Sequence, residues 1–532
     1  MNVPRVLLFA ALPLLVLMSA RAQEAKVRVK VKVDLEAAPD NGIGVARMVK
    51  GDAGSLVLVK TKGGRTAFGG VPQPDLDWTL VSLNADNMAV IKTDKPKIVW
   101  GEGPVALETI ENFDHQFRLI ASKPDPENAK LLLLQQVLSP RALTGKAAQI
   151  ITELPYDRLG KGAAYFAANT AVGFTTVVSA DSMKLLLHLI PSGTTHPAGS
   201  PVFALLLDKQ MAPLWSNTLA TDPKAQRVDV LDTRVDKAGA VWYFVRNVTD
   251  PDPKTREVLG YSFSLYRLDS AGQQEVKLEL SGKDFAQEAG IDVLANGTLV
   301  CSGIYSNPEG NRNESMGIFR TTLDAAAMKW TPAKTFPYEK QLVKKDEVLQ
   351  TNMRLEHVWA KHDGGLFVVT QKSGLEPHTV SNLSGKKVVK TEWMGGPFHI
   401  MEIDAAGELK WYKHIDRELD YGTDAPGATI STVFADVLYL FYNDDAANLE
   451  KRRAKQPIDP VGSPKDAVML EFKADGTDKG KVVMKEGYKQ AYLASANVWR
   501  MGEGRIGTLA NEGPGKQKTM PVYIEMSTDQ RK

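Results

Sequence analysis

The feature that most constrains the fold of this chain is a hairpin signal that recurs along its length. Tight turns rich in Gly, Asn and Asp separate short apolar runs, and these residues supply the positive backbone angles that short hairpins need. The turns centre near Asp52, Pro126, Asp181, Asp236, Asn296, Asp363, Asp436 and Glu503. Their spacing runs from 55 residues, between Pro126 and Asp181, to 74 residues, between Asp52 and Pro126. Such a quasi-period indicates a repeat architecture.

The clearest copy of the repeat runs from Arg354 to Ile415. Its four apolar runs form two hairpins, with turns at Asp363 and Asp404, joined by one long loop. Second hairpins follow most other turns, near Asp86, Asp208, Ser270, Asp324 and Asp475. A four-stranded antiparallel unit repeated around an axis is a propeller blade. The sequence therefore predicts an all-β protein that forms a single β-propeller of eight four-stranded blades.

Two alternatives to this architecture stay open. A ring of seven blades is one, because the second repeat has no clear second hairpin and its outer half is assigned to the apolar run AAQIITEL after Gly145. Two or three β-sandwiches in series are the other. Sandwiches would explain the short strands but not their grouping into fours, so we favour the propeller.

The two ends of the chain predict how the ring closes. Residues 26–35, KVRVKVKVDL, alternate apolar and basic side chains with period two, as in a strand with one buried face. This strand has no hairpin partner, whereas the last repeat is one strand short, since only MPVYIEM follows its hairpin. Pairing of the N-terminal and C-terminal strands would complete the eighth blade and leave no open sheet edge at the seam.

The first 22 residues resemble a secretory signal peptide. Arg5 precedes the apolar run Val6 to Met18, and Ala20-Arg21-Ala22 is an A-x-A cleavage site. Thirteen apolar residues interrupted by Pro13 are too few for a membrane-spanning helix, which is the alternative. We therefore expect residues 1–22 to be a signal peptide, residues 23–532 to be the propeller, and the protein to be exported to the bacterial periplasm, outer envelope or extracellular space.

Charge and cysteine content indicate which partners and which stabilising interactions to expect. The formal charge is only +2, and Lys and Arg are interspersed with Asp and Glu, so we expect no nucleic-acid partner. The single cysteine, Cys301, lies in an apolar run and is expected to be a buried small hydrophobe. One cysteine allows no intramolecular disulfide, so stability must come from the core. We expect a monomer with no transmembrane segment after signal cleavage.

One stretch resembles a known family. MEIDAAGELKWY, residues 401–412, is similar to the Trp-bearing repeat of quinoprotein-like propellers, in which an Asp, a Gly-containing turn and a Trp recur. The spacing from Gly407 to Trp411 matches that repeat, while Asp404 to Gly407 is one residue shorter. The resemblance implies that the Trp of one blade docks on the next blade. It does not imply a quinone cofactor, because the quinone-dependent dehydrogenases of that group use a vicinal disulfide, which a chain with one cysteine cannot form.

The sequence also predicts that the two faces of the ring differ. The turns within hairpins are short and lie on one face, whereas the other connections include the long segments 61–77, 191–201, 247–261, 305–316, 372–397 and 443–466. Long loops on a rigid scaffold commonly carry binding function, so we place any site on this long-loop face, near the mouth of the central channel. Residues 444–456, DDAANLEKRRAKQ, have no strand pattern and contain good helix formers after a candidate cap at Asp445, so they predict either a short helix or a solvated insert.

Aromatic, basic and acidic residues of these loops are the candidate binding residues, because aromatic and Arg side chains are the usual anchors of recognition surfaces. They are Tyr305, Arg312, His378, Trp393, Tyr442, Asp444, Asp445 and Arg452. The histidines lack zinc-binding spacing, and no phosphate-binding, dinucleotide-binding or nucleophile motif stands in a suitable context. We therefore expect no metal and no cofactor.

Two functions remain. The favoured one is a non-enzymatic, exported propeller that binds a protein or polymer through its long-loop face. The alternative is a hydrolase acting on glycans or esters, with carboxylates and His from several blades at the channel mouth. Such a site leaves no local motif in the sequence, because each blade contributes one residue.

Overall fold

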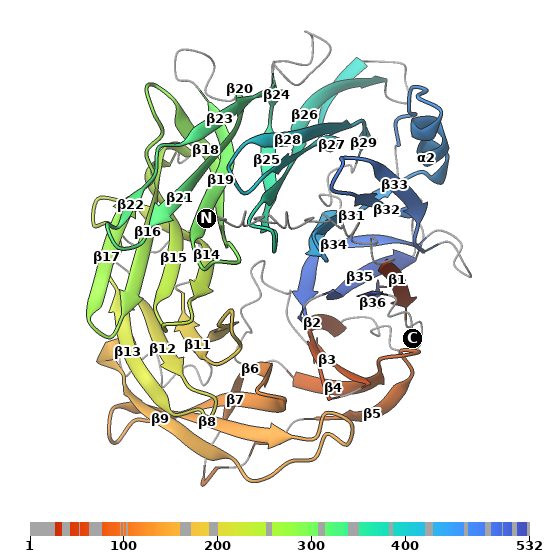
Figure 1. Ribbon diagram of the computed structural model, residues 1–532. Coiled ribbons are helices and arrows are strands. Elements are labelled where there is room, and N and C mark those ends of the chain that lie inside the picture. The colour runs from red at the N-terminus through yellow and green to blue at the C-terminus, as the bar shows by residue number, and fades with distance from the viewer. Residues whose placement is uncertain are drawn as a thin grey trace, which may run out of the picture.

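The computed structural model describes residues 27–33, 43–62, 77–159, 172–190, 201–251, 258–306, 314–338, 350–381, 387–420, 429–461, 466–484, 491–512 and 519–528, apart from positions 53, 96, 99, 103, 104 and 503. Within them the chain forms eight antiparallel blades arranged in a ring (Figure 1). The predicted all-β propeller of eight four-stranded blades is confirmed.

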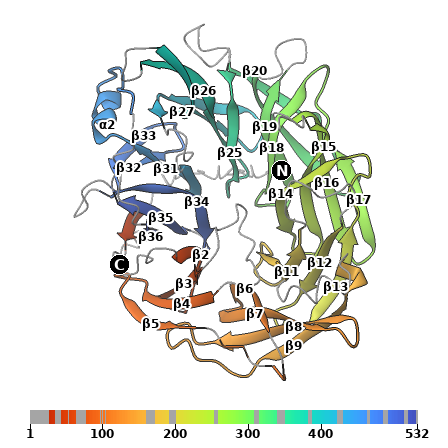
Figure 2. The same cartoon turned by 180° about the vertical axis from the view of Figure 1, so that it is seen from behind.

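The first strand of each blade lies nearest the axis of the ring, and the last lies at its rim (Figures 1 and 2). Blades 1 to 4 consist of β2 (Ile43–Lys50), β3 (Ser55–Lys62), β4 (Asp77–Asn84) and β5 (Val90–Asp94); β6 (Ala106–Phe113), β7 (Gln116–Asp125), β8 (Lys130–Leu138) and β9 (Gln149–Pro155); β10 (Thr175–Val178), β11 (Leu185–Leu189), β12 (Val202–Leu207) and β13 (Pro213–Leu219); and β14 (Arg227–Val235), β15 (Val241–Pro251), β16 (Val258–Asp269) and β17 (Gly272–Lys277).

Blades 5 and 6 each carry one short additional strand beside their four. Blades 5 to 8 consist of β18 (Phe285–Val293), β19 (Leu299–Ser306), β21 (Gly317–Asp324) and β22 (Lys329–Trp330), with β23 (Lys334–Pro337); β25 (Met353–Ala360), β26 (Leu366–Ser381), β27 (Lys387–Ile403) and β28 (Leu409–Ile415), with β29 (Leu419–Asp420); β30 (Thr429–Phe434), β31 (Val437–Asp444), β32 (Asp466–Phe472) and β33 (Asp478–Val482); and β34 (Ala491–Arg500), β35 (Arg505–Glu512), β36 (Thr519–Thr528) and β1 (Val27–Val33).

The remaining elements are short. β20 (Glu314–Ser315) pairs with β24 (Gln350–Thr351), a single 3-10 turn spans Asp157–Leu159, and α2 spans Ala446–Arg453. No helix in the described ranges is long and apolar enough to cross a membrane.

The predicted position of the first hairpin in the second repeat was wrong. The turn near Pro126 joins β7 to β8, the second and third strands of blade 2, so it is not the blade's first hairpin. That hairpin is the two-residue turn Asp114-His115 between β6 and β7, with φ of 50° and 57°. Asp and His tolerate this left-handed conformation without glycine, so the usual turn signal was missing. The apolar run assigned to the outer half of the repeat does contain the outer strand, β9.

The core lies between the blades. Eight apolar clusters occupy the eight interfaces between neighbouring blades, including the interface between blade 8 and blade 1. A strand in such a ring is covered on both faces, which explains the unbroken apolar run of β12, whose residues are all buried. Cys301 is fully buried in one of these clusters, as expected, and burial raises the pKa of its thiol.

Trp411 docks on the next blade, as the quinoprotein-like resemblance implied. Its ring lies 6.1 Å from that of Phe472 in blade 7 and packs over the turn at Gly476. Gly476 has a φ of +76°, and a Cβ atom there would lie 2.9 Å from Trp411 Cγ. Blade 3 makes a related contact, because Trp215 Nε1 donates to the carbonyl oxygen of Gly239 in blade 4 at 3.1 Å. Trp330 instead packs in the cluster between blades 4 and 5.

The ring closes through the two ends of the chain, as predicted. β1 pairs antiparallel with β36 in an unbroken register from Val27 opposite Thr528 to Val33 opposite Val522. The valines of β1 pack against the cluster between blades 7 and 8, whereas Arg28 and Lys30 are exposed. The alternation that predicted this strand is therefore the alternation between core and solvent.

Closure gives a test on two adjacent residues of β1. We expect Val31→Asp to lower the free energy of unfolding by about 3 kcal/mol, because it places a charge in the apolar cluster. Lys30→Thr, the matched control on the exposed side of the same strand, should change it by less than about 0.5 kcal/mol. Denaturant titration of both variants measures the difference, and equal stability of the two would mean that β1 does not carry the closure.

Candidate functional site

The long-loop face carries a projecting ribbon from blade 6. β26 pairs with β27 from Leu366 opposite Ile403 out to Ser381 opposite Lys387, but β25 follows β26 only to Lys372 and β28 follows β27 only to Phe398. Beyond those points, residues 373–381 and 387–395 form a two-stranded ribbon, which we call the blade 6 arm (Figure 1). The sequence predicted a loop over 372–397, and the structure corrects this to strands.

The arm is supported at its base by the neighbouring segments. β29 pairs with β27 through Met394 opposite Asp420 and Gly395 opposite Leu419. Leu419 also forms a parallel bridge with Val461. These contacts tie the arm to the connection that follows α2 in blade 7.

Helix α2 confirms the prediction of a short helix capped by Asp445. The Asp445 side chain accepts a hydrogen bond from Ala447 N at 2.9 Å, and Asp466 Oδ2 accepts one from Ala446 N at 3.0 Å. Both acceptors satisfy N–H groups of the first turn that have no partner within the helix. Lys451, Arg452 and Arg453 occupy the last turn, where positive charge is favoured by the helix dipole.

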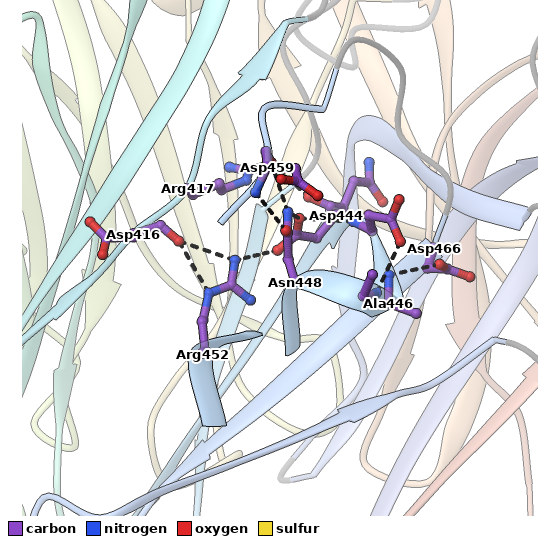
Figure 3. Close-up of polar contacts among 11 residues, drawn as sticks. Asp416, Arg417, Asp444, Ala446, Asn448, Arg452, Asp459 and Asp466 are labelled. Atoms are coloured by element: carbon purple, nitrogen blue, oxygen red, sulfur yellow. Dashed lines mark hydrogen bonds and ion pairs between the residues drawn. The ribbon is translucent and has the colours of Figure 1, made fainter. Parts of the chain in front are cut away.

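A buried polar network fixes α2 to blades 6 and 7 (Figure 3). The Asp444 carboxylate pairs with Arg452 and accepts from Asn448 Nδ2 at 2.8 Å. Arg452 also donates to the carbonyl oxygen of Asp416, through Nε at 3.2 Å and Nη2 at 3.0 Å. Asn448 binds both the carbonyl and the N–H of Asp459, at 3.0 and 2.9 Å. The helix is therefore held from three sides.

Two arginines lie against the ring of Tyr442 beneath this network. The guanidinium carbon of Arg417 lies 5.3 Å from the ring centroid and that of Arg452 lies 5.8 Å from it. Arg417 also lies 5.1 Å from the centroid of Phe398 and donates to the carbonyl oxygen of Asn443 at 3.1 Å. Arg–aromatic contacts of this kind join blade 6 to blade 7.

The structure places the predicted binding residues in different surroundings. Tyr305, Tyr442 and Asp444 are buried, with 5%, 0% and 1% exposure, so their side chains are not presented to a partner. Asp445 and Arg452 lie on α2 at the long-loop face, where Arg452 retains partial exposure. His378 and Trp393 stand in the arm, with backbones opposite Lys390 and Leu375. Arg312 lies outside the described residues.

Charged side chains that the sequence did not single out converge on the long-loop half of the channel. The inner strands of blades 5 and 6 each contain a register shift, which brings Glu288 and Glu356 toward one another. Glu288 accepts a hydrogen bond from Leu355 N. The positive charges of Arg354 and Arg417 stabilise the ionised Glu356 carboxylate, and that of Arg246 stabilises the ionised Glu288 carboxylate. The two glutamates are half-buried in the channel wall.

The environment of these glutamates raises both pKa values. Burial is the main cause at each site, and the charge of Glu288 adds to it at Glu356. The neighbouring arginines act in the opposite direction, and the pKa of Glu356 settles at about 7. With its amide oriented to satisfy its neighbours, Gln371 accepts from Arg417 Nη1 at 2.6 Å and donates to Glu356 Oε1 at 3.3 Å.

A cavity of about 390 Å³ opens on the opposite face, which carries the hairpin turns and which we call the plain face. Arg234, Trp242, Asn296 and Thr298 are among its lining residues. Asp236, also in its wall, already accepts from Gly239 N, Ala240 N and Trp242 Nε1. Among the described residues, no three His, Cys, Asp or Glu side chains gather as a metal site would require.

Comparison with known proteins gives distant structural matches. No family model and no curated protein matches the chain. The propeller of Dos1 has a TM-score of 0.43 and 8% identity, over 93% of this chain and 95% of that one. The β-propeller domain of the Trilobed protease from Pyrococcus furiosus has a TM-score of 0.35 and 10% identity, over 84% and 97%. The quinohemoprotein alcohol dehydrogenase from Comamonas testosteroni has a TM-score of 0.37 and 12% identity, over 91% and 76%.

At this level of similarity the comparisons say nothing about function. The fold assignment rests on the strand pairing itself, and the function must be argued from the residues of this chain.

The pKa of Glu356 predicts a pH-dependent stability. Because its folded value of about 7 exceeds its ordinary value of 4.5, the folded protein holds a proton that the unfolded chain releases. The resulting stabilisation is fully present below pH 4.5 and is lost as the pH rises through 7. The wild-type free energy of unfolding should therefore fall between pH 5 and pH 8. In Glu356→Gln, whose side chain stays neutral, this fall should be smaller by about 1 to 2 kcal/mol, allowing for screening in the channel.

Denaturant midpoints at the two pH values measure this effect. Glu153→Gln is the matched control, since Glu153 lies at the rim of blade 2 with its side chain 49% exposed. A Glu356→Gln variant whose stability falls with pH as steeply as that of the wild type would contradict the assigned ionisation.

Proposed function

We propose that this chain is an exported β-propeller that binds a protein or polymer partner through its long-loop face, with the blade 6 arm and helix α2 as the contact elements. The observation that carries the proposal is the arm. It extends nine residue positions beyond the blade on each strand, through residues 373–381 and 387–395, and its base is tied to blade 7 by β29.

The arrangement of the arm supports a binding role. Outside the pairing with β29, neither strand of the arm has a third strand beside it in the described part of the chain, so both present backbone N–H and C=O groups at an edge. Such edges pair readily with an added strand or accept polar groups of a partner. The charged residues Glu450, Lys451 and Arg453 on α2, in the connection between β31 and β32, supply a second polar surface on the long-loop face.

The buried network beneath α2 supports the same role indirectly. Binding surfaces that are already rigid lose less conformational entropy when a partner docks. Tyr442 and Asp444, which the sequence suggested as direct contacts, fit a positioning role here, because they hold Arg452 and Arg417 in place. Export remains part of the proposal and rests on the signal-like composition of residues 1–22.

The arm can be tested by capture from bacterial envelope extracts. We expect the double variant His378→Ala, Trp393→Ala to retain less than about a tenth of the captured partner, because one anchor residue is removed from each strand of the arm. Leu214→Ala is the matched control, since Leu214 is 47% exposed on β13 of blade 3, away from the arm. Protease treatment of the extract before capture separates a protein partner from a polymer.

The melting temperature of each variant shows that the fold is intact. Undiminished capture by the double variant, or an equal loss in the Leu214→Ala control, would reject the arm as the binding element.

A second function, hydrolysis of a glycan or an ester, is favoured by the Glu288–Glu356 pair. Paired carboxylates with raised pKa values are typical of acid–base catalysis, and a group with a pKa of about 7 can both donate and accept a proton near neutral pH. In this scheme Glu356 acts as the general acid and Glu288 as the base or nucleophile, while the adjacent arginines orient the substrate.

Chromogenic glycosides and acetate esters test this second function. If it is correct, turnover on one of them should fall at least about 100-fold in both Glu288→Gln and Glu356→Gln. Glu153→Gln serves again as the control for a carboxylate at the rim. Absence of turnover on every substrate, or turnover that the two channel variants leave unchanged, would dismiss the hydrolase.

A further inference from the structure

The plain-face half of the channel holds a second group of charged side chains, far from the arm. The group comprises residues near the ends of the inner strands of blades 4 to 8, beside the hairpin turns of the plain face: Asp232, Arg234, Asp292, His357, Trp359, Ser431 and Arg500. Arg500, the last residue of β34, reaches across to the strands of blades 6 and 7.

The Arg500 guanidinium is anchored through one nitrogen and one face. Its Nη2 donates to His357 Nε2 at 2.7 Å and to the carbonyl oxygen of Ser431 at 3.3 Å. Its central carbon lies 4.6 Å from the centroid of the Trp359 ring. Trp359 is itself held, because its Nε1 donates to Ser431 Oγ at 2.9 Å. The position of the cation is therefore fixed before any ligand arrives.

The acceptor role of His357 fits its environment. Burial, followed by the charges of Arg500 and Arg234, lowers the pKa of His357 to about 3. The imidazole is accordingly neutral at ordinary pH, and its Nε2 lone pair can accept from Arg500. This contact orients Arg500 but contributes no negative charge to balance it.

The rest of the Arg500 guanidinium is open. Its Nε and Nη1 atoms donate no hydrogen bond within the described part of the chain, and no carboxylate there lies within 4.0 Å of it. The residue is nevertheless exposed to the channel. An anchored cation with unused N–H donors in a solvent-reached channel is the arrangement that binds an oxyanion.

The carboxylates closest to Arg500 are already used by other groups. Asp232 lies 2.6 Å from Arg234 Nη1, and Asp292 lies 3.8 Å from Arg234 Nε while accepting from Ala360 N at 2.7 Å. They act on Arg500 only through space. Although Arg500 is exposed to the channel, the surrounding wall partly desolvates its guanidinium, and this desolvation, together with the like charge of Arg234, lowers the pKa of Arg500 to about 10.

We propose that Arg500 is the receptor for the carboxylate group of a small ligand that enters the channel from the plain face. The carboxylate accepts hydrogen bonds from the open nitrogens of Arg500 and supplies the direct counter-charge that Asp232 and Asp292, which act only through space, do not. His357, Trp359 and Ser431 act as positioning residues, because they hold the guanidinium in place. The site lies at the opposite end of the channel from the arm, so it does not depend on the proposed partner-binding function.

Matched pairs of small molecules test the site at pH 7.5. D-glucuronate and N-acetylglycine carry a carboxylate, whereas D-glucose and N-acetylglycinamide are their neutral counterparts. We expect saturable binding, followed by NMR, of at least one carboxylate and of neither neutral molecule. Binding of glucuronate alone would identify a carboxylated sugar as the ligand class. Binding of the neutral molecules as tightly as the acids, or of none of the four, would overturn the proposal.

Substitutions assign the binding to Arg500. Arg500→Gln should weaken it about 10- to 100-fold, the loss expected for hydrogen bonds to a charged group. Arg505→Gln is the matched control, since Arg505 lies on the same hairpin with 38% side-chain exposure but is already paired with Glu525 at 3.7 Å. Unchanged binding in Arg500→Gln, or an equal loss in Arg505→Gln, would refute the assignment.

Thermal melting establishes that each variant is folded. If Arg500→Gln does not fold, Arg500→Lys replaces it, since lysine keeps the charge but loses the contacts to His357 and Ser431. Lysine should weaken carboxylate binding severalfold, and binding by this variant equal to that of the wild type would count against an anchored guanidinium.

Discussion

The structure depends on the burial of apolar surface between neighbouring blades. Each of the eight interfaces holds its own cluster, so a blade is stable only when it has a neighbour on both sides. An open ring would expose two apolar faces and a sheet edge at the seam. Pairing of β1 with β36 closes this seam with the two ends of the chain. The seven residues of β1 therefore pair with a strand that lies at the other end of the sequence.

Most of the fold could be predicted because its signals are local. Short turns and alternating strands are specified within a dozen residues, and so is the capping of α2 by Asp445. Local signals also explain the two errors. The Asp114-His115 turn contains no glycine. Strand β26 contains Pro377 and β27 contains the pair Gly395-Gly396, which favour a loop although the strands continue through them.

The candidate site could be predicted only in outline. The long-loop face follows from topology, but whether a side chain is presented or buried depends on residues from other blades. Tyr442 looks like a recognition residue until Arg417 and Arg452 are seen to cover its ring. The channel groups are harder still, since Arg500 and His357 are 143 residues apart in sequence and belong to no motif. Their proximity is a property of the closed ring.

The inner strands of the ring hold charged groups in contrasting surroundings. Where blades 1 to 3 meet, one charge is balanced locally, because Arg47 pairs with Glu111 at 2.6 Å and Thr176 donates to the same carboxylate at 2.7 Å. Elsewhere the ring keeps charges that oppose each other, such as Glu288 beside Glu356, or that lack a close counter-ion, such as Arg500. Chains tend to keep such costly local arrangements where function requires them. Held only by flexible loops, these groups would separate or become solvated. Because the inner strands fix them, Glu356 keeps its pKa of about 7 and Arg500 keeps its open donors only while the blades remain locked together.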